Sequence, residues 1–301
     1  MDYIALNKLF EEQYQKNEIG YKAFLKEFKR TVEHIISVEG IPLAFEISAR
    51  LKSLDSIKDK HESTRYRIKE SILELNDLVG IRIVVVFPED REKVISIIKD
   101  EFDDKTTIKS RRRDYDKFGY NSVHLIVGVK KEWLATPDWR DHGEKRIEIQ
   151  VRTLAEHIWA ETSHTLFYKN EESIPDTIKR DLSRLSALLE VVDEKLQNLK
   201  KSVFDHFNYI RTCDYPEILN MDFNPETFRR MVNENSKGKL SFEDSQNQII
   251  STRIERNYNI IKAGLFDEII KSGQQSSSRD LDLDFIFEML DSWKEKSNEK
   301  G

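Results

Sequence analysis

One strand-like segment, "RIEIQVRT" at residues 146–153, carries a row of polar side chains. Successive side chains of a strand point to opposite faces, so its apolar residues share one face and its polar residues share the other. A further carboxylate, Asp77, stands at the start of the apolar run "DLVGIRIVVVF" at 77–87. The polar row consists of Glu148, Gln150 and Arg152.

Two carboxylates from neighbouring strand ends repel each other, and a divalent cation between them removes the repulsion. Hard oxygen ligands suit Mg²⁺, which takes one or two protein carboxylates and leaves its other positions to phosphates and water. Asp77 and Glu148 match that number, so the sequence predicts a Mg²⁺ site. The simpler interpretations are that the polar row faces water and that Asp77 caps a turn.

Basic residues surround these acids in the sequence. Arg82 lies inside an apolar run, where an unpaired charge is costly, so its guanidinium must reach a carboxylate, a phosphate or an aromatic plane. A basic run, "KSRRRDYDK" at 109–117, follows later in the chain. Carboxylate pairs combined with Lys and Arg are typical of phosphoryl-type transfer. The cations are Arg50, Lys52, Lys60, Lys109, Arg111, Arg112, Arg113 and Lys117.

An aromatic ring and a histidine follow the basic run in "FGYNSVHLIV" at 118–127. Because Gly119 precedes it, the ring of Tyr120 has room for a flat base to stack on it, which is worth about 1–3 kcal/mol. His124 lies on the strand that follows and could orient the phosphate or hydroxyl of an acceptor.

A sheet with helices must position these residues. Hydrophobic periodicity predicts strands within 42–52, 77–87, 121–129 and 144–153, and helices at 3–38, 56–69, 89–101 and 153–168. This alternation predicts an α+β domain with a mixed sheet. From Pro175 onward we expect a long helix whose leucines at 182–199 form a core or an oligomer seam, then short helices and a flexible linker at 272–280.

Net charge, cysteine count and the length of apolar runs argue against several classes of protein. The chain has 301 residues and a formal net charge of −6, whereas a general nucleic-acid binder is usually basic. One cysteine, Cys213, excludes an internal disulfide framework. No apolar run reaches the length of a membrane span, and the N-terminus lacks a secretory core. We therefore expect a soluble, cytoplasmic protein without membrane contact.

Four motifs occur in order: "SARLKSLDSIKDK", "NDLVGIRIVV", "RRRDYDKFGYNSVHLIV" and "EIQVRTLAEHIWAETSH". Together they resemble the synthetase domain of the RelA/SpoT family, the alarmone synthetases, over about residues 45–170. The resemblance implies a mixed five-stranded sheet flanked by helices, similar to nucleotidyltransferases, with a helical C-terminal region added. It implies transfer of the β,γ-pyrophosphate of ATP to a ribose 3′-hydroxyl, usually of GDP or GTP. The expected domains are N-terminal helices at 1–40, the synthetase domain at 41–203 and a helical region at 204–301.

The resemblance also implies a role for each site residue. Asp77 and Glu148 would carry Mg²⁺, and Glu148 is also a candidate for the general base, an assignment that stays open. Arg50 and Arg82 would sandwich the adenine, and Lys52, Ser56 and Lys60 would hold the ATP phosphates. Tyr120 would stack on the acceptor base, and His124, Lys117 and Arg152 would also bind the acceptor. Gln150 and Arg113 would be catalytic, and Gln150, Arg152 and His124 would brace the site.

Several features depart from the family pattern. Only "DKF" separates Tyr115 from Gly119, so the acceptor loop is short. No His-Asp dipeptide occurs and few residues precede Arg50, so we expect synthesis without hydrolysis. Short loops and extra domains also occur in toxin relatives that pyrophosphorylate the 3′ end of tRNA or an adenosine nucleotide. The alternative is such a toxin, with tRNA as acceptor and an antitoxin or regulatory partner. A homo-oligomer also fits the resemblance.

Overall fold

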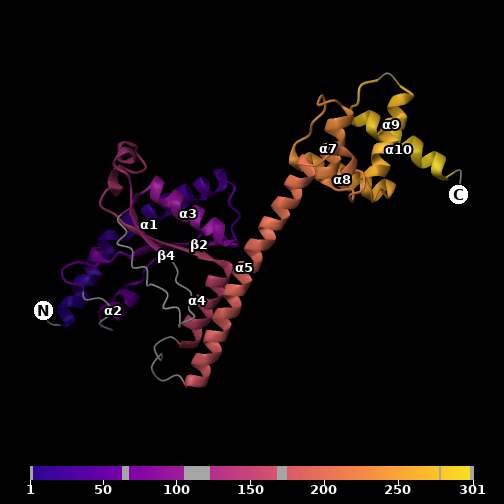
Figure 1. Cartoon of the computed structure of the whole chain (residues 1–301). Coiled ribbons are helices and arrows are strands. Elements are labelled where there is room, and N and C mark those ends of the chain that lie inside the picture. Colours follow the sequence, from indigo (N-terminus) through magenta and orange to yellow (C-terminus); the bar gives the residue numbers. More distant parts are fainter. Residues whose placement is uncertain (1–2, 63–67, 105–122, 168–174, 278, 299–301) are drawn as a thin grey trace. The chain divides into compact units, whose positions relative to one another are not determined.

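The chain divides into two compact units, Met1–Leu199 and Lys200–Gly301 (Figure 1). The structure is a computed structural model that describes residues 3–62, 68–104, 123–167, 175–277 and 279–298. The boundary between the units lies inside helix α5 (Asp176–Thr212), four residues before the predicted boundary at 203. None of the helices within these described ranges combines the length and the apolar character that a bilayer span requires.

The first unit is built on a mixed sheet of five strands, as the resemblance implied. The strands are β1 (Ser48–Leu51), β2 (Val79–Val85), β3 (Asp103–Asp104), β4 (Val123–Gly128) and β5 (Ile147–Thr153), in the spatial order β1-β2-β5-β4-β3. Strands β2 and β5 are parallel, and the other neighbours are antiparallel. The two-residue β3 has no counterpart in the sequence prediction, because two residues are too few to show a period.

Register places the polar row on one face of this sheet. Gly80 pairs with Glu148, and Gln150 pairs with both Arg82 and His124. Residues paired across neighbouring strands point to the same side, so these residues share a face. The opposite face is apolar, and its side chains are buried in the core, among them Ile81, Ile83, Leu125, Val127 and Ile149.

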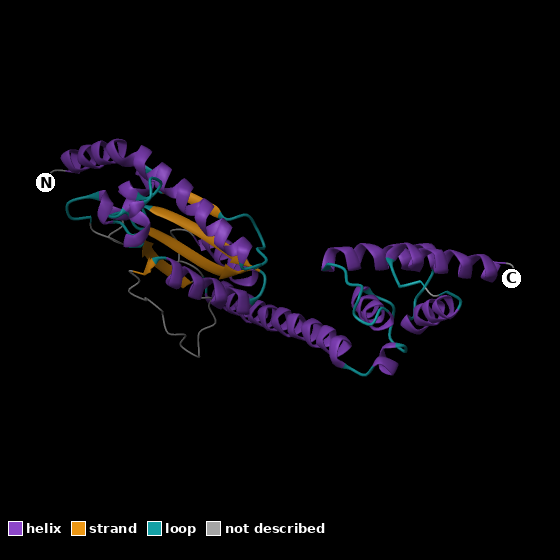
Figure 2. Ribbon diagram, turned by 90° about the horizontal axis from the view of Figure 1, so that it is seen from above, coloured by secondary structure: helices purple, strands orange, loops and turns teal. Residues whose placement is uncertain are grey.

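Helices α1 (Tyr3–Val38) and α3 (Pro88–Glu101) cover the apolar face (Figure 2). Pro88 ends the apolar run of β2 and starts α3, where its missing N–H costs nothing. Phe28 of α1 stacks on Phe102, with ring centroids 4.3 Å apart, and Trp139 packs edge-on against Phe28. Because α1 shares this core with the sheet, the predicted N-terminal segment 1–40 and the predicted domain from 41 form one unit here.

Helix α4 (Leu154–Phe167) follows β5, and the first part of α5 packs on it through Leu189 and Ala155 (Figure 1). A buried acid, Glu156, anchors this end of the sheet: it pairs with Arg91 of α3 and accepts a hydrogen bond of 2.8 Å from the backbone N–H of Thr153. Burial raises the pKa of Glu156, and the positive charge of Arg91 offsets part of that rise. This network therefore joins α3, β5 and α4.

The predicted helix 56–69 differs in its bounds. Helix α2 spans Leu54–Glu62, and Ile68 and Lys69 are not helical. The backbone N–H of Ile68 donates to Nδ1 of His61, 3.1 Å away, and residues 63–67 of the predicted helix lie outside the described residues. A 3₁₀ turn at Ile72–Glu74, capped by Ser71, leads into β2. Further 3₁₀ turns lie at Lys131–Ala135 and Arg140–His142.

The second unit is helical and has its own core. After the end of α5 it contains α6 (Tyr215–Ile218), α7 (Pro225–Asn235), α8 (Asp244–Tyr258), α9 (Ala263–Gln275) and α10 (Leu283–Asn298). Phe228, Phe266 and Ile286 are fully buried at its centre. The predicted linker 272–280 is wrong over 272–275, because α9 continues to Gln275 with Ile269 and Ile270 buried.

A buried acid in the second unit gives a prediction about stability. Asp267 accepts hydrogen bonds from Tyr215 and Asn235 and pairs with Lys271 at 2.8 Å. Burial alone would raise the pKa of Asp267, but these partners hold it below its ordinary value. The ionised acid therefore stabilises the folded unit above the ordinary pKa of an Asp, and this stabilisation is lost as the pH falls through the lower folded pKa.

We expect Asp267→Asn to lower the stability of the second unit by about 1.5–3 kcal/mol at pH 7, since hydrogen bonds to a charged group are lost. The difference from the parent chain should shrink in acid. Hydrogen exchange of α9 amides, compared between the two chains at matched pH, measures this. An equal difference at pH 7 and at the acid limit of folding would contradict the assignment. Asp280→Asn, at an exposed position, is the control.

Candidate active site

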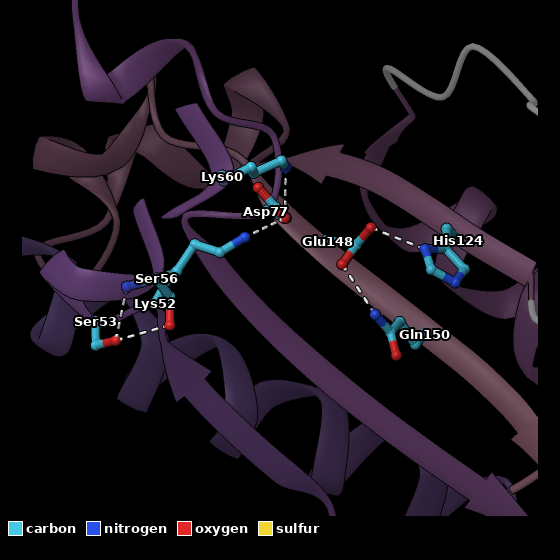
Figure 3. A network of polar contacts seen from close by, with 8 residues as sticks. All are labelled: Lys52, Ser53, Ser56, Lys60, Asp77, His124, Glu148 and Gln150. Carbon is cyan, nitrogen blue, oxygen red and sulfur yellow. Dashed lines mark hydrogen bonds and ion pairs between the residues drawn. The ribbon is translucent and has the colours of Figure 1, made fainter. Parts of the chain in front are cut away.

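Two lysines converge on Asp77, which precedes β2. The Nζ atoms of Lys52 and Lys60 lie 2.5 Å and 2.7 Å from the same atom, Oδ2 of Asp77. Lys52 follows β1 and is fixed there by a backbone hydrogen bond to Leu78, whereas Lys60 comes from α2. The structure thus brings together three residues that the sequence assigned to the phosphates and the metal (Figure 3).

Burial and charge act against each other in this cluster. Burial would raise the pKa of Asp77, but the hydrogen bonds from Lys52 and Lys60 outweigh it, so the pKa lies below its ordinary value. Burial lowers the pKa of Lys52, and the neighbouring Lys60 lowers it further, although Asp77 opposes both effects. The carboxylate is therefore ionised at neutral pH, and two cationic groups are held close together beside it.

Glu148 of β5 forms the other half of the site. Its Oε1 lies 2.8 Å from Nδ1 of His124 on β4, and its Oε2 accepts a hydrogen bond of 3.0 Å from Gln150. Oε1 of Gln150 in turn accepts from Arg152 at 3.0 Å. Burial would raise the pKa of Glu148, but the contact with His124 and the bond from Gln150 lower it below its ordinary value. The polar row is thus a connected chain of hydrogen bonds.

The carboxylate of Asp77, in the turn before β2, lies beside that of Glu148 on the neighbouring strand β5. Figure 3 shows the lysines on the far side of Asp77, and His124 and Gln150 on the far side of Glu148. The charge of Asp77 is near enough to raise the pKa of Glu148 as a smaller contribution. Oδ1 of Asp77 is shielded from solvent and has no hydrogen-bond partner among the described residues.

An orphaned, buried carboxylate oxygen beside a second carboxylate fits a hard divalent cation. Leaving such an atom without a partner costs free energy unless a ligand, an ion or an ordered water reaches it. Within the described ranges, no group of three or more His, Cys, Asp or Glu side chains could hold a metal. A site with two carboxylates instead suits Mg²⁺, whose remaining positions go to phosphates and water.

Arg82 points from β2 to a carboxylate, one of the three partners that the sequence allowed. Its Nη1 lies 2.8 Å from Oε1 of Glu161 on α4, and Arg152 reaches the same atom at 3.7 Å. Burial lowers the pKa of Arg152, and the charge of Arg82 lowers it further. Glu161 thus neutralises a pair of arginines beside the polar row.

Gly80 is a further residue of the site, which we did not predict from the sequence. Arg50 on β1 is exposed and pairs with Gly80, which pairs in turn with Glu148. Gly80 therefore leaves a gap on the polar face, between Arg50 and the next residue on that face of β2, Arg82. A glycine within the β-branched run at 79–85 was the available signal, because such a glycine often marks a close approach by a ligand.

The structure gives less support for the roles of the remaining predicted site residues. Ser56 is exposed on α2, and its hydroxyl accepts a hydrogen bond from Ser53 at 2.9 Å. Arg113, Lys117 and Tyr120 lie outside the described residues. Their roles at the basic loop and the acceptor base therefore stay predictions.

Comparison with known proteins identifies the domain that holds this site. Residues 49–173 match the region found in RelA/SpoT proteins. The chain carries a RelA/SpoT region. Asp77, Glu148 and the two lysines all fall within it.

Curated relatives cover much of the first unit. The chain is 29% identical over 201 residues to GTP pyrophosphokinase YjbM of Bacillus subtilis (strain 168), an alignment that covers 61% of this chain and 90% of the relative. It is 28% identical over 161 residues to GTP pyrophosphokinase YwaC of the same organism, covering 52% and 73%. These alignments leave more than a third of this chain unmatched.

A solved structure shares the fold. The small alarmone synthetase 1 from Bacillus subtilis bound to its product pppGpp superposes with a TM-score of 0.50 at 26% identity, over 64% of this chain and 98% of that one. The α+β fold and the resemblance to alarmone synthetases are therefore confirmed.

Proposed function

We propose that the protein transfers the pyrophosphate group of ATP to the ribose 3′-hydroxyl of GDP or GTP, as a GTP pyrophosphokinase. The observation that carries the proposal is the pair formed by Asp77, in the turn before β2, and Glu148, on the polar face of β5, with Lys52 and Lys60 bound to Asp77. Two similar proteins named GTP pyrophosphokinases, and a similar synthetase bound to pppGpp, support it.

The side chains of this site divide into two groups. Lys52 and Lys60 hold the phosphates of ATP, because their ammonium groups are already gathered at one point beside Asp77. Arg50 and Arg82, on either side of the gap at Gly80, hold the adenine by stacking, a contact that planar guanidinium groups make well. Binding the donor in this way fixes its phosphate chain against the sheet, so that little freedom remains to be lost in the reaction.

Asp77 and Glu148 would hold Mg²⁺, which when bound polarises the phosphoryl oxygens and neutralises developing charge. The acceptor hydroxyl must also lose its proton. A carboxylate whose pKa is held below its ordinary value is a weak base at neutral pH. The contacts of Glu148 with His124 and Gln150 therefore favour a role as ligand over a role as base.

An acceptor assay tests the proposed function. The purified chain is incubated with ATP labelled in the β- or γ-phosphate and with GDP, GTP, ADP or deacylated tRNA in separate reactions. Label on a guanosine nucleotide supports the proposal, whereas label only on tRNA or ADP supports the toxin-type alternative. A parallel incubation with a guanosine 3′-pyrophosphate tests the expected lack of hydrolysis. If pyrophosphate is transferred to none of the four acceptors, the proposed enzymatic function is wrong.

Substitution of Gly80 gives a prediction about ATP alone. A Cβ at this position would meet only the backbone oxygen of Glu148, at 3.6 Å, so the sheet itself can accept it. The added methyl groups of Gly80→Val would occupy the gap between the arginines. We expect the KM for ATP to rise about tenfold, as for a steric misfit of 1–3 kcal/mol, with an unchanged melting temperature.

Gly80→Ala should give a smaller increase, and the KM for the guanosine acceptor serves as the internal control. An equal rise in both KM values, or a rise that comes with a large loss of stability, would contradict the placement of adenine at Gly80.

A further inference from the structure

The second unit contains a pocket that the proposed reaction does not use. It has a volume of about 180 Å³ and lies between the end of α5, helix α7 and the segment that leads into α8. Its walls include Arg211, Arg229, Arg230, Leu240, Phe242 and Asn247. The RelA/SpoT region ends at residue 173, so the whole pocket lies outside it.

Two polar atoms at this pocket are buried and have no hydrogen-bond partner among the described residues. The side chain of Asn247 donates from Nδ2 to the backbone oxygen of Phe242, at 3.0 Å, which fixes the orientation of the amide. Its Oδ1 is shielded from solvent and accepts no hydrogen bond from any described residue, although Asn247 is only 3% exposed. Nε of Arg230 is likewise buried without an acceptor in the described part of the chain. Such atoms are costly unless a bound ligand or an ordered water satisfies them.

Positive charge is concentrated at the same place. The second unit has fifteen Lys and Arg residues against eighteen Asp and Glu residues, so it is acidic as a whole. Three arginines nevertheless line one pocket, with Glu226 as the only acidic residue in its wall. Arg211 binds both oxygens of Glu226, at 3.0 and 3.1 Å, and Arg229 pairs with Asp244 at 2.9 Å. An acidic unit with a local arginine cluster suits a small anion better than a nucleic acid.

An aromatic and aliphatic wall completes the pocket. Phe242 is half-buried and lies nearly parallel to Phe228, with an interplanar angle of 14° and centroids 6.1 Å apart. Leu240 and Val232 add apolar surface. The volume is smaller than the roughly 300–1,000 Å³ of pockets that enclose a drug-sized ligand. Only part of a ligand, of the size of a base, therefore fits inside, and the rest must lie at the mouth.

We propose that this pocket is a second, non-catalytic ligand site that binds a nucleotide. The base enters against Phe242 and donates an N–H to Oδ1 of Asn247. The phosphates stay outside and bind the arginines, whose planar guanidinium groups match phosphate oxygens. The proposal does not depend on the identity of the acceptor in the catalytic unit.

Photochemical crosslinking of the full-length chain tests the site directly. The probes are 8-azidoguanosine and 8-azidoadenosine triphosphates, and the readout is the labelled tryptic peptide. We expect label in the peptide 240–253, which contains Phe242 and Asn247. An excess of unmodified nucleotide should displace it, and inorganic phosphate at the same concentration should not. Label within 49–173 reports nucleotide binding to the catalytic unit, so a failure of the proposed function can be distinguished from a failure of this second site.

Two variants make the test specific. Arg230→Gln removes one guanidinium, and Ser241→Glu places a negative charge at the exposed rim without touching the core. We expect either to reduce label in 240–253 by about tenfold, as for a lost charge-assisted hydrogen bond. Arg256→Gln, exposed on α8 outside the pocket, is the matched control. Label confined to the first unit, label equal in all folded variants, or displacement by phosphate alone would overturn the proposal.

Discussion

Replacing Asp77 with asparagine is expected to abolish the transfer of pyrophosphate from ATP. The substitution keeps the shape of the side chain but removes the charge that both lysines bind. It also removes the carboxylate whose free oxygen, Oδ1, is the best candidate to meet a cation. Loss of several kcal/mol of charge stabilisation corresponds to a rate about 10³-fold lower.

A second effect adds to the first. In Asp77→Asn the two ammonium groups remain close together without their shared anion, and Lys52 is only 12% exposed. Repulsion and burial then lower the pKa of Lys52 further, so a phosphate loses part of the positive charge that should bind it. We therefore expect weaker ATP binding as well as slower transfer.

Initial rates and ATP binding, measured separately at saturating acceptor, distinguish these two losses. Asp181→Asn, an exposed change of the same type on α5, should leave both unchanged. A folded Asp77→Asn chain that retained more than about a tenth of the parent rate would show that the acid does not take part in the chemistry, since a factor of ten is only about 1.4 kcal/mol.

The sheet could be predicted from the sequence because its two faces differ so sharply. The alternation of Ile147, Ile149 and Val151 with polar residues fixes both the strand and the side that each residue faces. A carboxylate and a glutamine on the exposed side then had to lie together. The same reasoning could not find β3, whose two residues join the sheet only through pairing with β4.

Pairing across the sheet supplied what the sequence could not show. No pattern in the chain indicates that Lys52 and Lys60, on separate elements, bind one oxygen of Asp77. The role of Gly80 in the site became clear only from the strand register, which places it between Arg50 and Glu148. These contacts belong to the tertiary structure, because they depend on how β1 and α2 pack against β2.

The prediction for the helical second unit was wrong for a different reason. The small polar residues at 272–280 suggested a linker, yet the buried Phe266, Ile269 and Ile270 hold α9 as a helix to Gln275. Packing of an apolar face overrides the weak helix propensity of Gly273 and the serines around it. The pocket beside Asn247 could not be predicted either, since its walls come from α5, α7 and the start of α8.

Glu148→Gln is expected to lower the rate of transfer by about 10²–10³-fold while ATP remains bound, as when one stabilising group is removed from a preorganised site. The amide oxygen of glutamine can still accept the hydrogen bond from Gln150, and its NH₂ group can donate to Nδ1 of a neutral His124, so the hydrogen-bonded row can be kept. The loss is therefore assigned to the missing charge. Glu194→Gln, exposed on α5, is the matched control.

The response of this variant to Mg²⁺ separates the two roles that Glu148 could have. If the carboxylate is a ligand, Glu148→Gln should need a higher Mg²⁺ concentration for half-maximal activity and recover part of its rate at saturation. If it is the general base, added Mg²⁺ should restore nothing, and the fall in rate that accompanies protonation of Glu148 in acid should disappear from the pH profile. The pKa of Glu148, held low by His124 and Gln150, makes the first outcome the expected one. A Glu148→Gln chain with the rate and Mg²⁺ dependence of its parent would remove Glu148 from both roles.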